Sequence, residues 1–131
     1  MKQKYIAGDL VKYIGIASPI VVQITEVREE KLLIDLGECN WYLADRSEVD
    51  SIRLTGEILE KNGFKEEQHQ KEGTSEWYDF YHYDLGINIV YEVEENKFAA
   101  YLDGKKLREI KYVHELQHIL WALGLNAELR A

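Results

Sequence analysis

The side chains best suited to chemistry lie in one segment, His114-Glu115-Leu116-Gln117-His118, which has the spelling of a zinc peptidase motif. Histidines at positions i and i+4 share one face of a helix, as two ligands of one metal ion must. Glu115 would then be the general base that activates a metal-bound water molecule. A zinc hydrolase is therefore the first chemistry to weigh.

The rest of the chain offers little to complete such a site. A catalytic zinc ion takes a third protein ligand, which in familiar zinc peptidases lies downstream of the motif. Only Glu128 follows His118 as a candidate ligand, and a helix that is the last element leaves nothing to close a cleft. We therefore expect no catalytic residue, no metal and no cofactor. We expect His114 and His118 to project toward solvent or a polar rim.

The same segment has the strongest helical pattern in the chain. Apolar residues recur at three- and four-residue steps, which predicts a helix buried along one side and ended by Gly124; they are Ile110, Val113, Leu116, Leu120 and Leu123. A buried Leu120 predicts that Leu120→Ala costs about 2–5 kcal/mol. A surface His118 predicts that His118→Asn changes stability by less than about 0.5 kcal/mol.

Residues 77–83 form the most aromatic stretch of the chain. Tyr and Trp are favoured as interface anchors, because they bury a large area and keep a polar tip. With two aromatic residues from an earlier strand, they make a candidate binding surface of Trp41, Tyr42, Trp77, Tyr78, Tyr81 and Tyr83. The alternative is that these rings fill the core, since strands favour aromatic residues.

Two sets of charged residues also allow both a binding role and a purely structural role. A basic cluster, Lys105, Lys106, Arg108 and Lys111, would contact a phosphate or an acidic partner, or would be a solvated strand edge that discourages pairing. An acidic set would mimic nucleic acid toward a nuclease, or would only solubilise the protein; it comprises Glu26, Glu29, Glu30, Glu66, Glu67 and Glu72.

Composition narrows the class of protein. The chain has 131 residues, 46% of them apolar, and a net charge of −8, so long nucleic acids are poor partners. The single cysteine, Cys39, excludes an internal disulfide and is expected in the core or a strand. No apolar run reaches the roughly 18 residues of a membrane span, and no signal-peptide core is evident. We expect a soluble, cytoplasmic protein with no membrane partner.

Short alternating segments predict an α+β fold. Five strands are expected between residues 10 and 54, in a small curled antiparallel sheet. A short helix capped by Thr55 and ended by Gly63 is expected next, followed by a solvated loop or hairpin tip at residues 65–76. Three or four antiparallel strands would then pack on the C-terminal helix, with Asp103-Gly104 as a two-residue hairpin turn. We expect a lobe at residues 1–54 and another at 55–131, in one compact unit.

Two segments carry a resemblance to known proteins. The opening Gly8-Asp9-Leu10-Val11 with its short strands looks like an SH3-like barrel of the KOW or Tudor type. The segments Leu54–Phe64 and Lys111–Gln117 resemble those of small phage and prophage accessory proteins, which have Gln and Asn where this chain has Glu115 and His118. Gly56 and Ile58 depart from the Glu and Trp of that group. The resemblance implies a mobile-element origin.

These observations support two hypotheses. The first is a non-enzymatic accessory protein that binds and masks a host protein, such as a defence component. The second is a nucleic-acid or small-nucleotide binder, in which Trp41 and Tyr42 stack on bases and the basic cluster meets phosphates.

Overall fold

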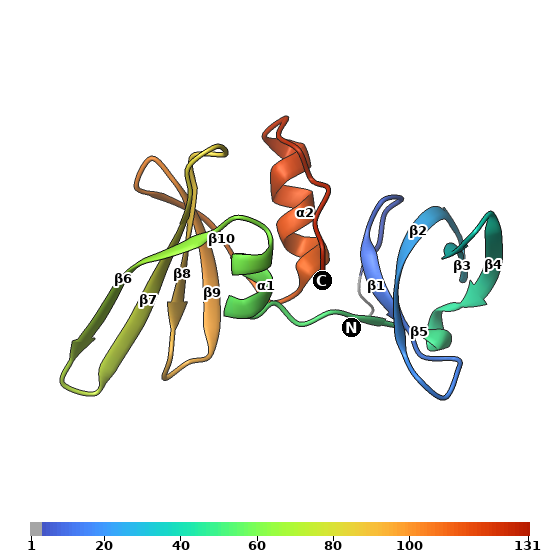
Figure 1. Cartoon of the computed structure of the whole chain (residues 1–131), viewed down its shortest axis with the longest axis horizontal. Helices are drawn as coiled ribbons and strands as arrows, with labels where there is room; N and C mark the ends of the chain where they lie inside the picture. Colours follow the sequence, from blue (N-terminus) through green and yellow to red (C-terminus); the bar gives the residue numbers. More distant parts are fainter. Residues whose placement is uncertain (1–3) are drawn as a thin grey trace.

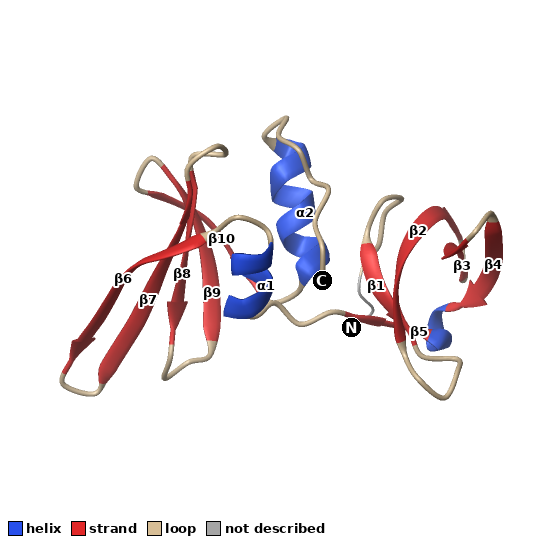
Figure 2. Cartoon of the chain, viewed as in Figure 1, coloured by secondary structure: helices blue, strands red, loops and turns tan. Residues whose placement is uncertain are grey.

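The computed structural model describes residues 4–131. In this part of the chain, two five-stranded antiparallel sheets lie on either side of two α-helices (Figures 1 and 2). The expected α+β class is confirmed. No helix in residues 4–131 has both the length and the apolar character needed to cross a membrane.

The first sheet is built from the short alternating segments expected from the sequence. Its order is β4-β3-β2-β1-β5, and a 3-10 turn, Arg46–Glu48, precedes the last strand. Inward residues such as Val11, Ile24 and Ile34 are buried. The strands are β1 (Leu10–Tyr13), β2 (Ile20–Arg28), β3 (Lys31–Gly37), β4 (Asn40–Asp45) and β5 (Val49–Ser51).

Cys39 is an exception to the sequence expectations for this sheet. It is exposed and lies in the turn between β3 and β4, where it and Glu38 have φ angles of 61° and 51°. The prediction that it lies in the core or a strand is wrong, because the hairpin requires a left-handed turn at these positions.

The second sheet has the order β10-β9-β8-β7-β6. One face of it packs against both helices (Figure 2). Its elements are α1 (Gly56–Lys61), β6 (Lys65–Glu72), β7 (Ser75–His82), β8 (Ile87–Glu92), β9 (Lys97–Leu102), β10 (Lys105–Ile110) and α2 (Val113–Ala122).

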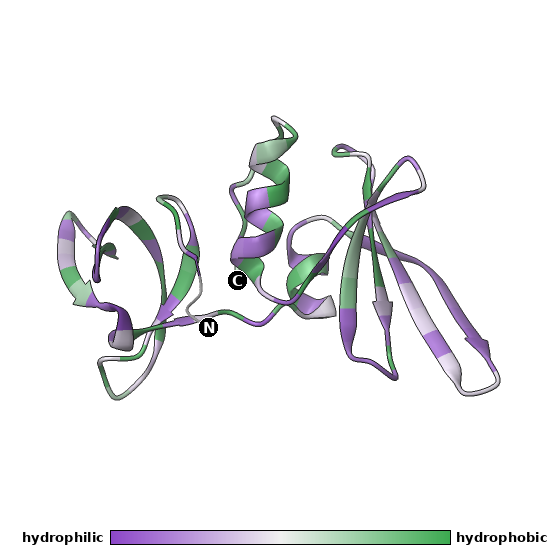
Figure 3. Ribbon diagram, turned by 180° about the vertical axis from the view of Figure 1, so that it is seen from behind, coloured by the Kyte–Doolittle hydropathy of each residue, from purple (hydrophilic) through white to green (hydrophobic). Residues whose placement is uncertain are grey.

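Strand β6 corrects the expectation of a solvated loop or hairpin tip at residues 65–76, because only the turn after Glu72 is a hairpin tip and the residues before it form a strand. It pairs with β7 over its whole length, yet all eight of its residues are exposed, and it is hydrophilic throughout (Figure 3). An edge strand with no buried face shows no apolar alternation, so the periodicity that identifies most strands is missing.

Turn and cap residues behave as their types predict. The side chain of Thr55 accepts a hydrogen bond from the backbone N–H of Ile58 at 3.2 Å, which caps α1. Asp103 and Gly104 both have positive φ angles, 51° and 79°, as a two-residue hairpin with the right-handed twist requires. Gly124, with a φ of 72°, ends the last helix as expected.

Two hydrophobic clusters make up the core. One lies inside the first sheet and includes Val11 and Leu32. The other lies between the second sheet and the helices and includes Ile89 and Leu120. The segment after β5 is held against the start of α2, because the Leu54 N–H donates to the Lys111 carbonyl oxygen and the Val113 N–H donates to the Ile52 carbonyl oxygen. Helix α2 therefore lies between the two sheets (Figure 1).

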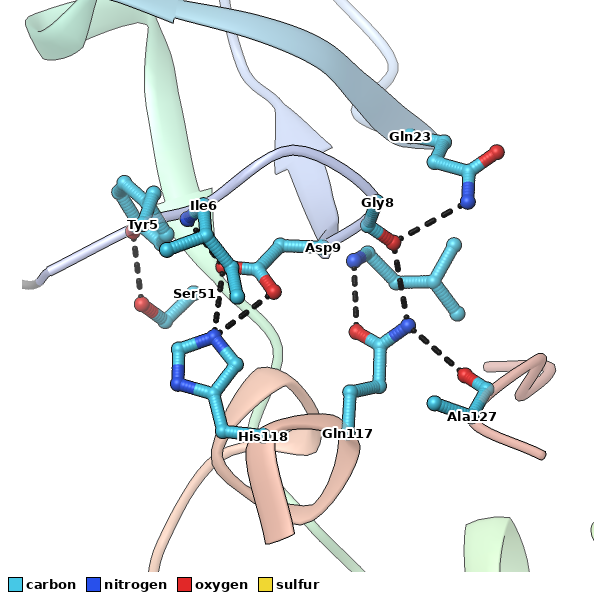
Figure 4. Close-up of polar contacts among 10 residues, drawn as sticks. Tyr5, Ile6, Gly8, Asp9, Gln23, Ser51, Gln117, His118 and Ala127 are labelled. Atoms are coloured by element: carbon cyan, nitrogen blue, oxygen red, sulfur yellow. Dashed lines mark hydrogen bonds and ion pairs between the residues drawn. The ribbon is translucent and has the colours of Figure 1, made fainter. Parts of the chain in front are cut away.

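The polar side of α2 is the joint between the lobes, with Gln117 at its centre (Figure 4). The Gln117 side chain accepts from the Leu10 N–H at 2.8 Å and donates to the carbonyl oxygens of Gly8 at 3.1 Å and Ala127 at 3.2 Å. It is 1% exposed. One amide thus satisfies backbone groups of the first lobe and of the C-terminal tail.

Gly8 must be glycine for this approach. Its φ is 95°, and a Cβ atom there would lie 2.7 Å from the ring of Trp121 on α2. Both the backbone conformation and the close contact disfavour any side chain. The Gly-Asp-Leu segment at the start of β1 therefore fits directly against the helix.

We predict that Gln117→Leu lowers the free energy of unfolding by about 2–4 kcal/mol, because it leaves buried backbone groups without partners. Gln23→Leu is the matched control: its exposed amide also donates to the Gly8 carbonyl, at 3.1 Å, and its loss should cost less than about 1 kcal/mol. Urea denaturation of both variants measures the difference. Equal effects would show that Gln117 does not hold the joint.

Candidate functional site

A row of aromatic rings crosses four strands of the second sheet. Hairpin register places His69, Tyr78, Tyr91 and Phe98 directly opposite one another on β6 to β9. Consecutive ring centroids are 4.2, 6.5 and 4.6 Å apart. We call these four residues the aromatic ladder. Cross-strand aromatic pairs stabilise a sheet, and here they also form a continuous ring surface.

A pocket of about 330 Å³ lies between this ladder and the start of α1. It is on the helix-bearing face of the sheet, because its walls include the core residues Phe80 and Leu54. The residues that line it are Leu54, Thr55, Gly56, Glu66, Tyr78, Phe80, Tyr91, Asn96 and Phe98. We call it the aromatic pocket.

Gly56 controls the width of this pocket. A Cβ atom at that position would lie 3.1 Å from the ring of Phe80, which is tighter than ordinary contact. Glycine at the first position of α1 therefore lets the helix start close to the sheet and keeps its own side of the pocket open.

The polar groups of the pocket are few and placed at its rim. The Tyr91 hydroxyl donates to the Asn96 side chain at 2.8 Å. Burial, and then the nearby Glu76 and Glu66 carboxylates, raise the pKa of Tyr78, so its hydroxyl stays protonated. Glu66 is the charged side chain that lines the pocket. A ligand there would meet aromatic rings, hydroxyl and amide groups, and one carboxylate.

The net charge of the protein is concentrated around this pocket. Residues 57–96, from α1 through β8, contain eleven Asp and Glu but three Lys and no Arg, whereas the remaining residues contain thirteen of each sign. The region around the aromatic ladder therefore carries the whole formal charge of −8. Such local charge attracts cations and repels anions.

A second cavity of about 300 Å³ adjoins the first and shares Asn96 and Phe98 with it. Its charged walls are balanced between three basic residues, Arg53, Lys97 and Lys111, and three acidic residues, Glu95, Glu109 and Glu115. The aromatic pocket thus differs from its neighbour both in ring content and in charge.

The predicted aromatic surface is divided among several places. Tyr78 lines the pocket, while Trp77 and Tyr81 alternate with it and point to the opposite face of the sheet. Trp41 and Tyr42 lie on β4 of the other sheet, at the far end of the molecule (Figure 1). Tyr83 follows β7 and donates to Glu67. The six residues therefore do not form one surface.

The basic cluster lies on and just after the edge strand β10. Lys106 and Arg108 pair with Glu109 and Glu115 at 3.3 and 2.8 Å. Lys105 and Lys111 are exposed, and the Lys111 ammonium lies 5.6 Å from the ring of Tyr112. Two of the four positive charges are thus already matched by carboxylates, which weakens the cluster as a phosphate site.

Glu115 and His118 of the zinc-like motif each have a structural partner. The Glu115 carboxylate accepts from the backbone N–H groups of Lys111 and Tyr112 at 2.8 and 3.0 Å, which caps α2. His118 Nε2 lies 2.8 Å from a carboxylate oxygen of Asp9, which is 0% exposed. Within residues 4–131, no group of three or more His, Cys, Asp or Glu side chains is arranged to hold a metal ion.

The expectation that both histidines face solvent or a polar rim is wrong for His114, whereas His118 lies at a partly exposed polar position. His114 is 1% exposed, with its ring 5.1 Å from that of Tyr5 and 5.7 Å from that of Tyr112. The side chain of His118 is 23% exposed and is covered by the first lobe through Asp9. A helix between two sheets has little solvent side, and the sequence pattern alone did not show the second contact.

Sequence reasoning missed Tyr91, Phe98, Glu66 and Asn96 as members of one site. The signal was present in the turn at Glu94–Asn96, since a short hairpin there places Tyr91 opposite Phe98. Strand β6 was not recognised as a strand, so His69 and Glu66 were not placed in the sheet beside Tyr78. No protein-family model, curated protein or solved structure matched this chain.

The buried imidazole of His114 should make the stability of the protein depend on pH. Burial, followed by the proximity of His118, lowers its pKa from 6.5 to about 4. Between these values the unfolded chain binds a proton that the folded protein does not, so stability falls as the pH drops from about 6.5 to about 4. We expect a loss on the order of 2 kcal/mol from this group.

His114→Phe is the control, because it keeps the ring packing and removes the titrating group. It also removes Nδ1, which is buried without a hydrogen-bond partner, so the variant should be at least as stable at pH 7. Burial raises the pKa of Asp9 and acts in the opposite direction, but it does so in both proteins. Parallel pH-dependent denaturation curves would contradict the prediction.

We also predict that His118→Leu costs about 2–3 kcal/mol at pH 7, because it leaves the buried Asp9 carboxylate with one fewer partner. The sequence-based expectation of a neutral His118→Asn rested on a surface position, which the contact with Asp9 removes. Thermal melts with and without a chelator should show the same loss. A chelator-sensitive wild type would restore the zinc interpretation.

Proposed function

We propose that this protein is a non-enzymatic accessory protein that acts by binding another protein through the aromatic pocket. The observation that carries the proposal is the aromatic ladder, in which His69 is exposed and only Phe98 is buried. Tyr78 and Tyr91 pack on the core at one edge yet remain partly exposed. Partly exposed Tyr residues around a pocket are typical anchors for a partner.

The resemblance to phage and prophage accessory proteins supplies the biological setting of the proposal. In that setting the partner is a host protein, such as a defence component, and binding masks it. Catalysis has less support, because Glu115 and His118 are engaged in a helix cap and in the joint with Asp9.

We further propose that the first lobe is an SH3-like barrel. Its strand order, β4-β3-β2-β1-β5, and the 3-10 turn before β5 support this assignment. Fold alone does not define function. We therefore propose that the barrel supports α2 and does not form the binding site.

The alternative of a nucleotide or nucleic-acid binder is less well supported. Lys106 and Arg108 are paired with carboxylates, and the aromatic pocket lies in the acidic part of the chain. Phosphate binding would have to weaken as salt concentration rises. A salt-dependent affinity for single strands, duplexes or cyclic nucleotides at low salt would favour the alternative over our proposal.

Affinity capture from host lysate tests the proposal. We expect a stoichiometric partner with the wild type that is lost with Tyr78→Ala, because the pocket wall is removed. Trp77→Ala is the matched control, since its side chain lies one position away on the opposite face of the same strand. Circular dichroism verifies that both variants are folded.

Recovery of no stoichiometric partner by the wild type would contradict the proposed function. Loss of the partner with Trp77→Ala and its retention with Tyr78→Ala would instead place binding on the opposite face of the sheet and overturn the assignment to the pocket.

A further inference from the structure

We infer that the aromatic pocket receives a cationic planar side chain, an arginine presented by a basic segment of the partner. This inference rests on the proposed function and names the chemistry that the partner must bring. Three independent features support it: the ring surface, the carboxylate at the rim and the distribution of charge along the chain.

The ring surface is suited to a guanidinium group. Four aromatic residues line the pocket, namely Tyr78, Phe80, Tyr91 and Phe98. A guanidinium is flat and weakly hydrated, so it stacks on such rings through both cation–π and dispersion contacts. A volume of about 330 Å³ also leaves room for the aliphatic part of the arginine side chain.

The polar groups at the rim are acceptors suited to the N–H donors of a guanidinium. Glu66 lines the pocket, and none of the nine lining residues is Lys or Arg. The guanidinium has five N–H donors, which a carboxylate accepts in pairs. The Asn96 side-chain oxygen, which already accepts from Tyr91, offers a further acceptor beside the ring surface.

The acidic charge of this part of the chain also favours a cationic ligand. Residues 57–96 carry eleven acidic and three basic side chains, and they include the helix, the turn and the hairpin around the pocket. At ordinary ionic strength the nearest of these charges contribute most to the potential at the pocket. An anionic ligand would therefore be repelled, a neutral aromatic ligand would gain nothing from Glu66, and a basic peptide segment is favoured on both counts.

Arginine fits better than lysine because of the shape of the site. The rings of Tyr78 and Tyr91 lie 6.5 Å apart and are inclined by 30°, and Glu66 lines the same pocket, so the planar fork of arginine can contact rings and carboxylate at once. Lysine presents a compact and strongly hydrated ammonium group, which loses more hydration on an aromatic surface. We expect a lysine peptide to bind several-fold more weakly than its arginine counterpart.

The test compares three short peptides, acetyl-Gly-Gly-Xaa-Gly-Gly-amide, in which Xaa is arginine, citrulline or lysine. Citrulline has nearly the shape of arginine but no charge. Titrations followed by amide chemical shifts of the full-length protein should place the arginine peptide at Glu66, Tyr78, Tyr91, Asn96 and Phe98. The affinity should fall about tenfold with citrulline, as expected for the loss of a cation–π contact and an ion pair.

Two carboxylate variants separate the site from the general field. Glu66→Gln should weaken arginine binding about three- to tenfold, because the lining carboxylate is lost. Glu72→Gln makes the same change in net charge at the end of β6, outside the pocket, and should change affinity less than about twofold. Both positions are exposed, so both variants should fold.

Equal binding of arginine and citrulline peptides would overturn the inference, as would equal effects of Glu66→Gln and Glu72→Gln or shifts that map elsewhere. Such results would leave a partner captured through Tyr78 unaffected. Conversely, arginine binding at the pocket with no captured protein would overturn the proposed function and retain the cation site.

Discussion

Helix α2 is the element on which the rest of the structure depends, because it must bury two different faces at once. One face is apolar and completes the core of the second sheet with Leu116 and Leu120. The other face is polar and meets the first lobe through Gln117 and His118. On a buried polar face, each group left without a partner costs free energy. This cost fixes Gly8, Asp9 and Leu10 opposite the helix.

The sequence predicted those parts of the fold in which one face is apolar and the other is solvated. The five strands of the first sheet, the helix capped by Thr55 and the Asp103-Gly104 turn all follow from local pattern and turn chemistry. The same reasoning failed where both faces of a segment are equally exposed or equally covered. Strand β6 is exposed on both sides, so it lacks an apolar face, and the polar face of α2 is covered by the first lobe, so its polarity did not indicate exposure.

The candidate site was predicted only in part, for a related reason. Aromatic residues were correctly selected as notable, but their selection by sequence proximity joined Trp77 to Tyr78, which point to opposite faces. The ladder instead joins Tyr78 to residues on three other strands. Likewise, the zinc-like spelling placed His114 and His118 on one face of a helix, which the structure retains at a ring separation of 5.5 Å. What the spelling did not specify was the partner of each residue.

The exposed edge strand β6 has a consequence for the behaviour of the protein in solution. An edge strand offers unpaired backbone groups to other molecules, and natural proteins protect such edges with charged residues and bulges. Strand β6 has both, since its residues are charged or polar and its pairing with β7 shifts register between Glu66 and Gln68. The acidic side chains that define the chemistry of the pocket therefore also keep the sheets of neighbouring molecules apart. As the pH falls toward the range in which carboxylates are protonated, this repulsion weakens, and β6 becomes an edge that is more open to pairing with a neighbouring molecule.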